Sequence, residues 1–186
     1  MTQAQWKSVM GANPAAHSTS DRMPVEQVSW EDAQAFLAKV NERVPGGGFR
    51  LPAEAEWERA AQGVEPGPET AWFRDNTLVP ARAAGPFLPV EAYAPKPVAS
   101  KQPNALGLYD LSGNVWEWCS SLNRPYPYDP SDGRESPAGT HARVLRGGSY
   151  ADSREMLNQA LRHSERPGRR QRWNGLRVAR STPGSR

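Results

Sequence analysis

The chain has 186 residues and a mass of 20.5 kDa, which is the size of one ordinary domain. Hydrophobic residues make up 37% of it, the net charge is +3, and no apolar run approaches the roughly 20 residues that cross a bilayer, which excludes membrane insertion. A single cysteine, Cys119, excludes an internal disulfide and a cysteine-clustered zinc site. The sequence opens without a basic and apolar leader, so we expect a cytoplasmic protein, with surface display through a partner as the alternative.

The first third of the chain carries the helix signals. A short helix is predicted over residues 2–10. Ser29 is followed by acidic residues, and apolar residues then recur every three or four positions over 30–44, which predicts an amphipathic helix that ends before Pro45. A second longer helix is predicted over 52–61, because proline and glutamate favour its first turn.

Strand signals are short and come later in the chain. Residues 62–102 break into turns marked by proline and glycine, with a short extended piece at 90–93. Strands are predicted at 143–146 and 175–180. The sequence therefore predicts an α+β architecture with two main helices, short strands and much ordered loop.

Four segments occur in an order that is far more specific than any one of them. They are PVEQVSWEDA (24–33), FRLPAEAEWE (49–58), LGLYDLSGNVWEW (106–118), and RGGSY (146–150) with GLR (175–177). The set resembles the formylglycine-generating-enzyme domain, also called the sulfatase-modifying factor domain. This resemblance implies a C-type lectin fold of the formylglycine-generating-enzyme subclass, as a single domain over residues 1–180 with a disordered tail over 181–186.

The resemblance also implies a calcium ion at the tryptophan-rich segment. Its ligands would be the side chains of Asp110 and Glu117 and the backbone carbonyls of Gly113 and Val115. The local chemistry agrees, because two carboxylates seven residues apart on a tight turn can converge with free carbonyls on one hard cation. The alternative is an ordinary turn whose tryptophans fill the core and whose carboxylates bind backbone amides or an arginine.

The enzymes of that family carry two copper-binding cysteines after the Gly-Gly-Ser-aromatic motif. Here the corresponding positions hold Asp152 and Leu157, and neither is a thiolate. We therefore expect no copper or iron and no enzymatic activity. A divergent metal-dependent oxidase or oxygenase that uses His17, His141 and His163 is the alternative from the enzyme class.

The segment from residue 151 to 173 lies between framework-like motifs and has little hydrophobic periodicity. It is predicted to be an ordered loop, the usual location of binding residues. Arginine and tryptophan, which are enriched at interface hot spots, occur in it. The alternative is an exposed loop that binds nothing. The candidate ligand-binding residues are Tyr150, Ala151, Asp152, Ser153, Leu161, His163, Arg166, Arg169, Arg172 and Trp173.

Non-catalytic members of this fold that end soon after a Gly-Phe-Arg-like strand resemble the variable proteins of diversity-generating retroelements. In those proteins a reverse transcriptase rewrites the C-terminal codons, and a rigid scaffold displays the outcome for ligand binding. The resemblance implies a protein or peptide ligand, held on a C-terminal loop surface that can be hypervariable.

Charge supplies a third alternative. Residues 141–186 contain eleven arginines and three acidic residues, a net charge of +8, so a basic nucleic-acid-binding module is conceivable from the sequence. The other interpretation is that several of these arginines hold loops by hydrogen bonds to carbonyls and carboxylates. The only aromatic residue among the loop arginines is Trp173, whereas stacking platforms for bases come in series.

Overall fold

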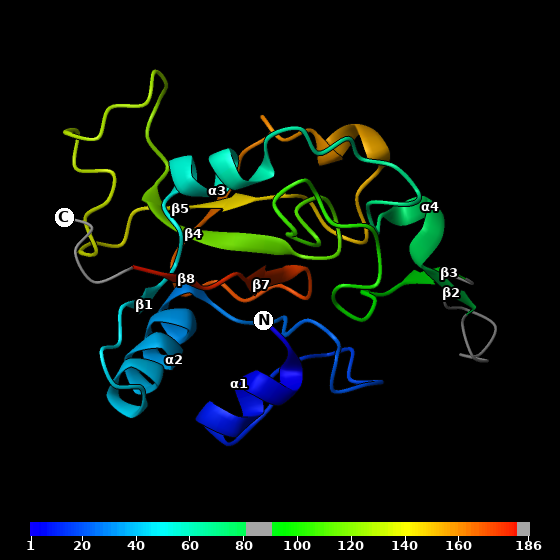
Figure 1. Cartoon of the computed structure of the whole chain (residues 1–186), viewed down its shortest axis with the longest axis horizontal. Coiled ribbons are helices and arrows are strands. Elements are labelled where there is room, and N and C mark those ends of the chain that lie inside the picture. The colour runs from blue at the N-terminus through cyan, green and yellow to red at the C-terminus, as the bar shows by residue number, and fades with distance from the viewer. Residues whose placement is uncertain (81–90, 182–186) are drawn as a thin grey trace.

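The centre of the molecule is a four-stranded sheet in the order β6-β5-β4-β7 (Figure 1). The computed structural model describes residues 1–80 and 91–181. Strand β7 runs parallel to β4, and the other neighbouring pairs are antiparallel. The strands are β4 (Trp116–Leu122), β5 (Arg143–Arg146), β6 (His163–Glu165) and β7 (Asn174–Leu176).

Two small sheets and the helices surround this centre. Helices α1 and α2 lie on one side of the central sheet and α3 lies on the other, while α4 sits beside β2 and β3 at the far end of the molecule (Figure 1). The helices are α1 (Gln3–Met10), α2 (Trp30–Arg43), α3 (Glu54–Ala61) and α4 (Arg74–Thr77), with a 3-10 turn at Arg154–Leu157. The small sheets pair β1 (Phe49–Arg50) with β8 (Ala179–Arg180), and β2 (Leu78–Pro80) with β3 (Glu91–Tyr93).

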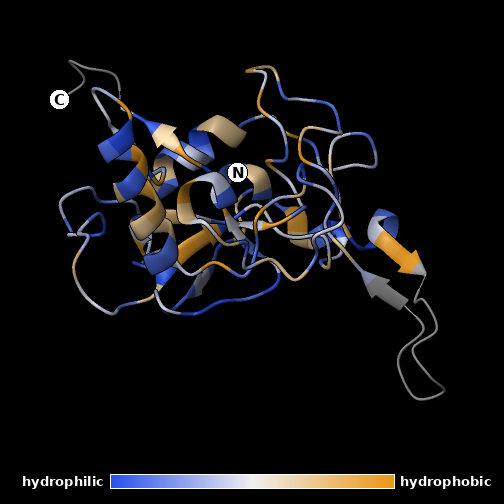
Figure 2. Cartoon of the chain, turned by 90° about the horizontal axis from the view of Figure 1, so that it is seen from below, coloured by the Kyte–Doolittle hydropathy of each residue, from blue (hydrophilic) through white to orange (hydrophobic). Residues whose placement is uncertain are grey.

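Strand β4 is buried on both faces. Side chains alternate across a strand, so Trp116 and Trp118 pack into the main core with α1 and α2, while Cys119 joins a second core around Trp57 of α3. Strand β5 divides in the same way, with Leu145 in the main core and Val144 in the second. In the view from below, hydrophobic segments are concentrated near the centre of the molecule, and the short helix beside the grey loop is hydrophilic (Figure 2).

The helix predictions are confirmed with small shifts at the ends. Ser29 and Asp32 form a reciprocal capping box at the start of α2, with bonds of 3.0 and 2.9 Å. Thr2 caps α1 in the same manner. Helix α3 begins at Glu54, two residues later than predicted.

The strand predicted at residues 143–146 is confirmed, and the extended piece predicted at 90–93 is observed as β3. The predicted strand over 175–180 is divided into β7 and β8, because Arg177 between them turns toward Glu117. Strand β4 is not predicted, since a strand that is buried on both faces has no alternation of polar and apolar residues. The structure also adds α4 and β2 to the segment 62–102, and it adds β6 and the 3-10 turn to the segment 151–173, which is predicted to be loop. Most of the predicted tail, 182–186, lies outside the described residues.

No helix in the part of the chain that the structure describes is long and apolar enough to cross a membrane.

The turn before β4 requires glycine at position 113. Gly113 has φ of 75°, and a Cβ atom there would lie 2.0 Å from the Trp72 carbonyl oxygen. Gly63 has the same φ of 75°, but no atom lies within 4 Å of its Cβ position. The two glycines therefore separate the effect of the left-handed conformation from the effect of the close approach.

We expect Gly63→Ala to lower the free energy of unfolding by about 1 kcal/mol, the cost of the left-handed conformation. Gly113→Ala should cost about 3 kcal/mol more, because the Trp72 backbone must also move. Urea denaturation of both variants measures the difference. Equal losses of unfolding free energy in the two variants would show that the close approach of Gly113 to Trp72 does not affect the stability.

Candidate functional site

The tryptophan-rich turn before β4 holds both ends of the C-terminal segment. Asn114 has φ of 63°, its N–H donates to the Trp72 carbonyl at 2.7 Å, and its carbonyl accepts from the Tyr150 N–H at 2.8 Å. The Trp116 N–H donates to the Trp173 carbonyl at 2.8 Å. The segment that starts after Tyr150 and ends at Trp173 is therefore fixed at both ends by the same turn.

Glu117 is the more enclosed of the two carboxylates on this turn. Its Oε2 accepts from Trp57 Nε1 at 2.7 Å and from Arg177 Nε at 2.8 Å, and its Oε1 accepts from Arg177 Nη2 at 2.9 Å. Arg177 also donates to the Tyr109 carbonyl at 2.7 Å. Glu117 thus forms the ion pair with an arginine that the sequence leaves open as an alternative to a metal ligand.

Asp110 has one carboxylate oxygen free. Its Oδ2 accepts from the Ala99 N–H at 2.8 Å, whereas Oδ1 is buried and has no hydrogen-bond partner among the described residues. Desolvation raises the pKa of the Asp110 carboxyl above its ordinary value of 3.8, and the negative charge of Glu117 raises it further. A buried oxygen in this state is costly unless a proton or a cation is bound to it.

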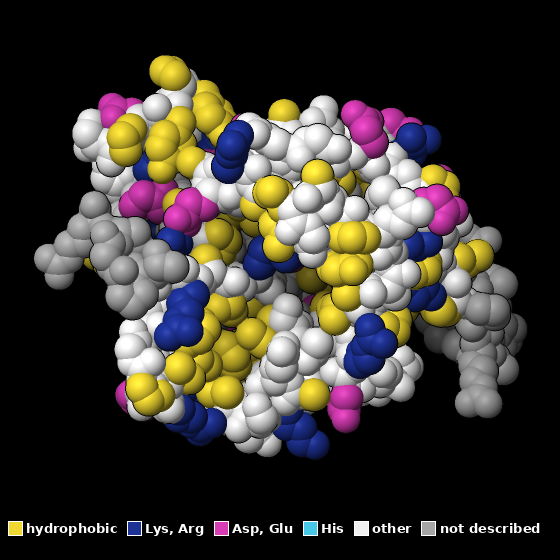
Figure 3. Space-filling model, in the orientation of Figure 1, with side chains coloured by type: hydrophobic (Ala, Val, Ile, Leu, Met, Phe, Trp, Pro, Cys, Tyr) yellow, Lys and Arg dark blue, Asp and Glu magenta, His cyan; other side chains and the backbone are white. Residues whose placement is uncertain are grey.

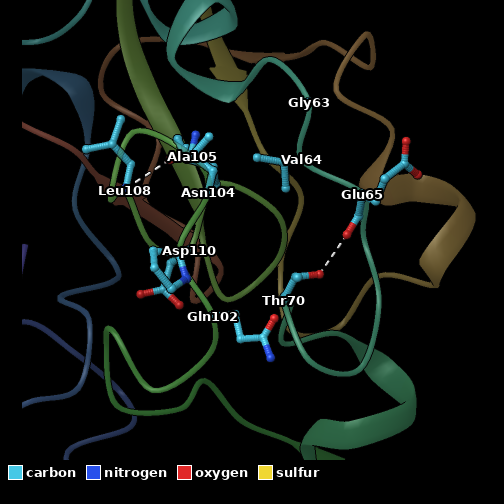
Figure 4. A pocket seen from close by; sticks show the side chains of 11 residues that line it. Gly63, Val64, Glu65, Thr70, Gln102, Asn104, Ala105, Leu108 and Asp110 are labelled. Carbon is cyan, nitrogen blue, oxygen red and sulfur yellow. Dashed lines mark hydrogen bonds between the residues drawn. The ribbon is translucent and has the colours of Figure 1, made fainter.

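Two cavities meet at Asp110. One, of about 240 Å³, is lined by Asp110, Val115, Glu117 and Arg177 among others. The other, of about 260 Å³, extends from Asp110 to Thr70 (Figure 4). Three of the four predicted calcium-binding residues therefore share one cavity, and their oxygens are of the kind that calcium prefers.

The ten predicted ligand-binding residues fall into two groups. Five have structural contacts: Tyr150 is buried, Leu161 and Trp173 pack against the main core, Asp152 Oδ2 accepts from Ser149 N and Oγ, each at 2.8 Å, and the His163 ring centre lies 5.4 Å from the ring centre of Trp116. The others are partly or fully exposed. They are Ala151 and Ser153, which are half-buried, and Arg166, Arg169 and Arg172, which are exposed.

Asp152 and Leu157, the two residues at which a copper-binding cysteine pair would be expected, both have structural contacts. Asp152 closes a turn with Ser149, and its carbonyl accepts from the Arg74 N–H at 2.9 Å. Leu157 is buried and packs with Ala71 and Phe73. These two side chains stabilise the segment in place of the thiolates.

Several C-terminal arginines are framework residues. Arg143 and Arg146 are fully buried, and both donate to backbone carbonyls. Arg162 forms a two-bond pair with the buried Glu54, at 2.5 and 2.8 Å. The sequence predicts only that the charge of Glu54 is favourable near the start of a helix, and it does not predict the pairing of Glu54 with Arg162. The excess of positive charge therefore reaches the surface chiefly through the loop arginines.

The fold and the turn define a C-type-lectin-fold domain of the formylglycine-generating-enzyme subclass, as predicted. The chain belongs to the sulfatase-modifying factor enzyme 1-like domain family, whose model matches residues 1–182.

Relatives in this family include enzymes and an inactive protein. The formylglycine-generating enzyme of Streptomyces coelicolor is 38% identical over 160 residues, which cover 79% of this chain and 48% of that protein. The inactive C-alpha-formylglycine-generating enzyme 2 of Mus musculus is 33% identical over 183 residues, 89% of this chain and 50% of that protein. The chain thus spans about half the length of these curated relatives.

A solved structure confirms the predicted resemblance to a variable protein. Treponema denticola variable protein 1 matches with a TM-score of 0.76 and 28% identity, and the match covers 96% of this chain and 81% of that one.

The free oxygen of Asp110 gives a pH-dependent prediction. The pKa of Asp110 is raised in the folded state, so as the pH rises the unfolded chain loses the carboxyl proton at a lower pH than the folded protein. The folded protein therefore becomes less stable as the pH rises and Asp110 ionises. In calcium-free buffer at neutral pH, Asp110→Asn should raise the free energy of unfolding by about 1 kcal/mol. The difference should shrink as the pH falls toward 3.8. Urea denaturation at several pH values measures it, and a difference that does not change with pH would contradict it.

Proposed function

We propose that this protein is a non-enzymatic scaffold of the variable-protein type, which binds a protein or peptide ligand through its C-terminal loop surface. The single observation that carries the proposal is the division within residues 150–173. The backbone and five side chains are tied to the framework, while the remaining candidate side chains are available at the surface. Such a division lets side chains differ without a change of fold.

The similarity to Treponema denticola variable protein 1 over 96% of the chain supports this assignment. A further support is that Asp152 and Leu157, which the resemblance places at the copper-binding positions, are not thiolates and are held in structural contacts. The alternative is a divergent oxidase or oxygenase, since relatives include formylglycine-generating enzymes. Elemental analysis of the purified protein separates the two proposals, because stoichiometric copper or iron would favour the enzyme.

Affinity in such a scaffold comes from preorganisation. The loop backbone is ordered when the chain folds, so binding does not have to order it again. Gln171 illustrates this: its carbonyl accepts from the N–H groups of Gln27 and Asn174, at 3.1 and 3.0 Å. The side chains of neighbouring residues can then differ while the loop keeps its path.

We also propose that a calcium ion braces the turn beneath this surface. Asp110 and Glu117 would supply carboxylate oxygens, and Gly113 and Val115 would supply carbonyls. The unpartnered Oδ1 of Asp110 supports the proposal. Arg177 competes for Glu117, so the ion would share this carboxylate with the guanidinium group. The ion would act as a brace, with no part in a reaction.

The scaffold proposal predicts tolerance to substitution. Changing Ala151→Ser, Ser153→Ala, Arg166→Gln and Arg172→Gln together should alter the free energy of unfolding by less than about 1 kcal/mol, because these side chains contribute little to packing. Denaturant titration followed by tryptophan fluorescence measures the change.

The matched control lies in the same segment. Leu157→Ala should cost about 3 kcal/mol, because Leu157 is buried against Phe73. Loss of folding in the four-residue variant would contradict the proposal, since it would mean that the displayed side chains support the fold.

The calcium proposal predicts a shift in melting temperature. Calcium at about a hundredfold excess over its dissociation constant should raise the melting temperature by about 5 °C relative to EDTA. Asp110→Asn should abolish this rise. If calcium stabilises the wild-type protein and the variant equally, the ion does not bind at this turn.

A further inference from the structure

The segment 166–173 presents positive charge on a fixed backbone. Arg166, Arg169 and Arg172 are exposed, and the segment contains no acidic residue. The Arg169 N–H donates to the Arg166 carbonyl at 2.9 Å, which closes a turn between two of the three. The neighbouring Pro167 is buried, and its carbonyl accepts from the Glu31 N–H at 3.2 Å. The arginines therefore project from a loop that is already anchored.

No described carboxylate lies within 4 Å of these three arginines. Among the side chains that the structure describes, Asp32 is the carboxylate that pairs with an arginine of this segment, and its partner is Arg170. Arg169 contacts a neutral partner. When the Gln171 amide is oriented so that its oxygen faces Arg169, this oxygen accepts from Arg169 Nε at 2.9 Å and from Nη2 at 3.1 Å. The side chain is thereby oriented while its charge remains available.

The Arg170 pair shows which ligand chemistry this loop suits. Arg170 Nε and Nη2 donate to the two carboxylate oxygens of Asp32, at 2.6 and 2.7 Å. Two parallel bonds of this kind match the guanidinium group to a carboxylate in both geometry and charge. The adjacent arginines offer the same group to solvent.

We propose, on the basis of the scaffold function above, that the partner of this surface is an acidic protein or peptide segment whose carboxylates bind Arg166, Arg169 and Arg172. Their guanidinium groups would form two-bond pairs with aspartate or glutamate side chains of the partner.

Two features favour a carboxylate cluster over a nucleic acid. The guanidinium group of Arg170 already pairs with a carboxylate through two parallel bonds, which is the geometry proposed for its neighbours. Trp173, the one aromatic residue of segment 166–173, packs against the main core, whereas stacking platforms for bases come in series.

Fluorescence anisotropy with the full chain tests the proposal. The probes are a labelled peptide of alternating glutamate and serine, the same peptide with glutamine in place of glutamate, and a single-stranded oligonucleotide of equal negative charge. The glutamate peptide should bind, and the glutamine peptide should not. Arg166→Gln, Arg169→Gln and Arg172→Gln together should weaken the binding by about tenfold or more.

The control removes three exposed positive charges from the helices, by Lys7→Gln, Lys39→Gln and Arg59→Gln, and should change the affinity by less than about twofold. Absence of glutamate-peptide binding, equal effects of the two triple variants, or tighter binding of the oligonucleotide at the same salt would each overturn the proposal. The melting temperature of the loop variant is a separate readout, so failure here is distinguishable from failure of the scaffold proposal.

Discussion

The rest of the structure depends on the burial of β4 on both faces. A strand in this position needs neighbours that come unusually close, and glycines allow it. A Cβ at Gly175 in β7 would lie 2.7 Å from the Val25 carbonyl oxygen, and one at Gly113 would lie still closer to Trp72. Since β7 is parallel to β4, the chain must make a long excursion before it returns to pair with it. That excursion contains the candidate binding surface, so the surface is a consequence of how β4 is enclosed.

Buried arginines provide part of the stabilisation that a larger apolar core provides in other proteins. Long loops leave many carbonyls outside any strand or helix, and these need donors when they are buried. Arg143 stacks on Trp30 with its guanidinium carbon 4.1 Å from the ring centre, and donates to the Ser120 and Ser136 carbonyls at 2.7 Å. Arg146 joins Leu161 and Glu58 in a similar way. Much of the positive charge in the C-terminal part therefore belongs to arginines that stabilise the fold. The loop arginines carry the positive charge that is left for binding.

The sequence predicts local structure well where the signal is local. The caps of α1 and α2 lie within three residues of their partners, so they are legible in the sequence. The pairing of Glu117 with Arg177 joins residues 60 positions apart, and no periodicity records it. The motifs predict the family because they reflect the whole fold. They do not tell which loop residues are free: Tyr150 and Arg172 look equally suited to binding, yet one is buried and the other exposed.

The contacts of Asp152 and Leu157 bear on how one fold can carry different functions. A reactive thiolate needs access to solvent and substrate, whereas Leu157 contributes to stability only because it is enclosed. A side chain at one position cannot meet both requirements. Asp152 closes a turn with Ser149, and Leu157 packs against Phe73, so the backbone of the segment is anchored at these two points. On the proposed scaffold function, such anchoring lets the projecting side chains set the affinity for a ligand without altering the stability of the fold.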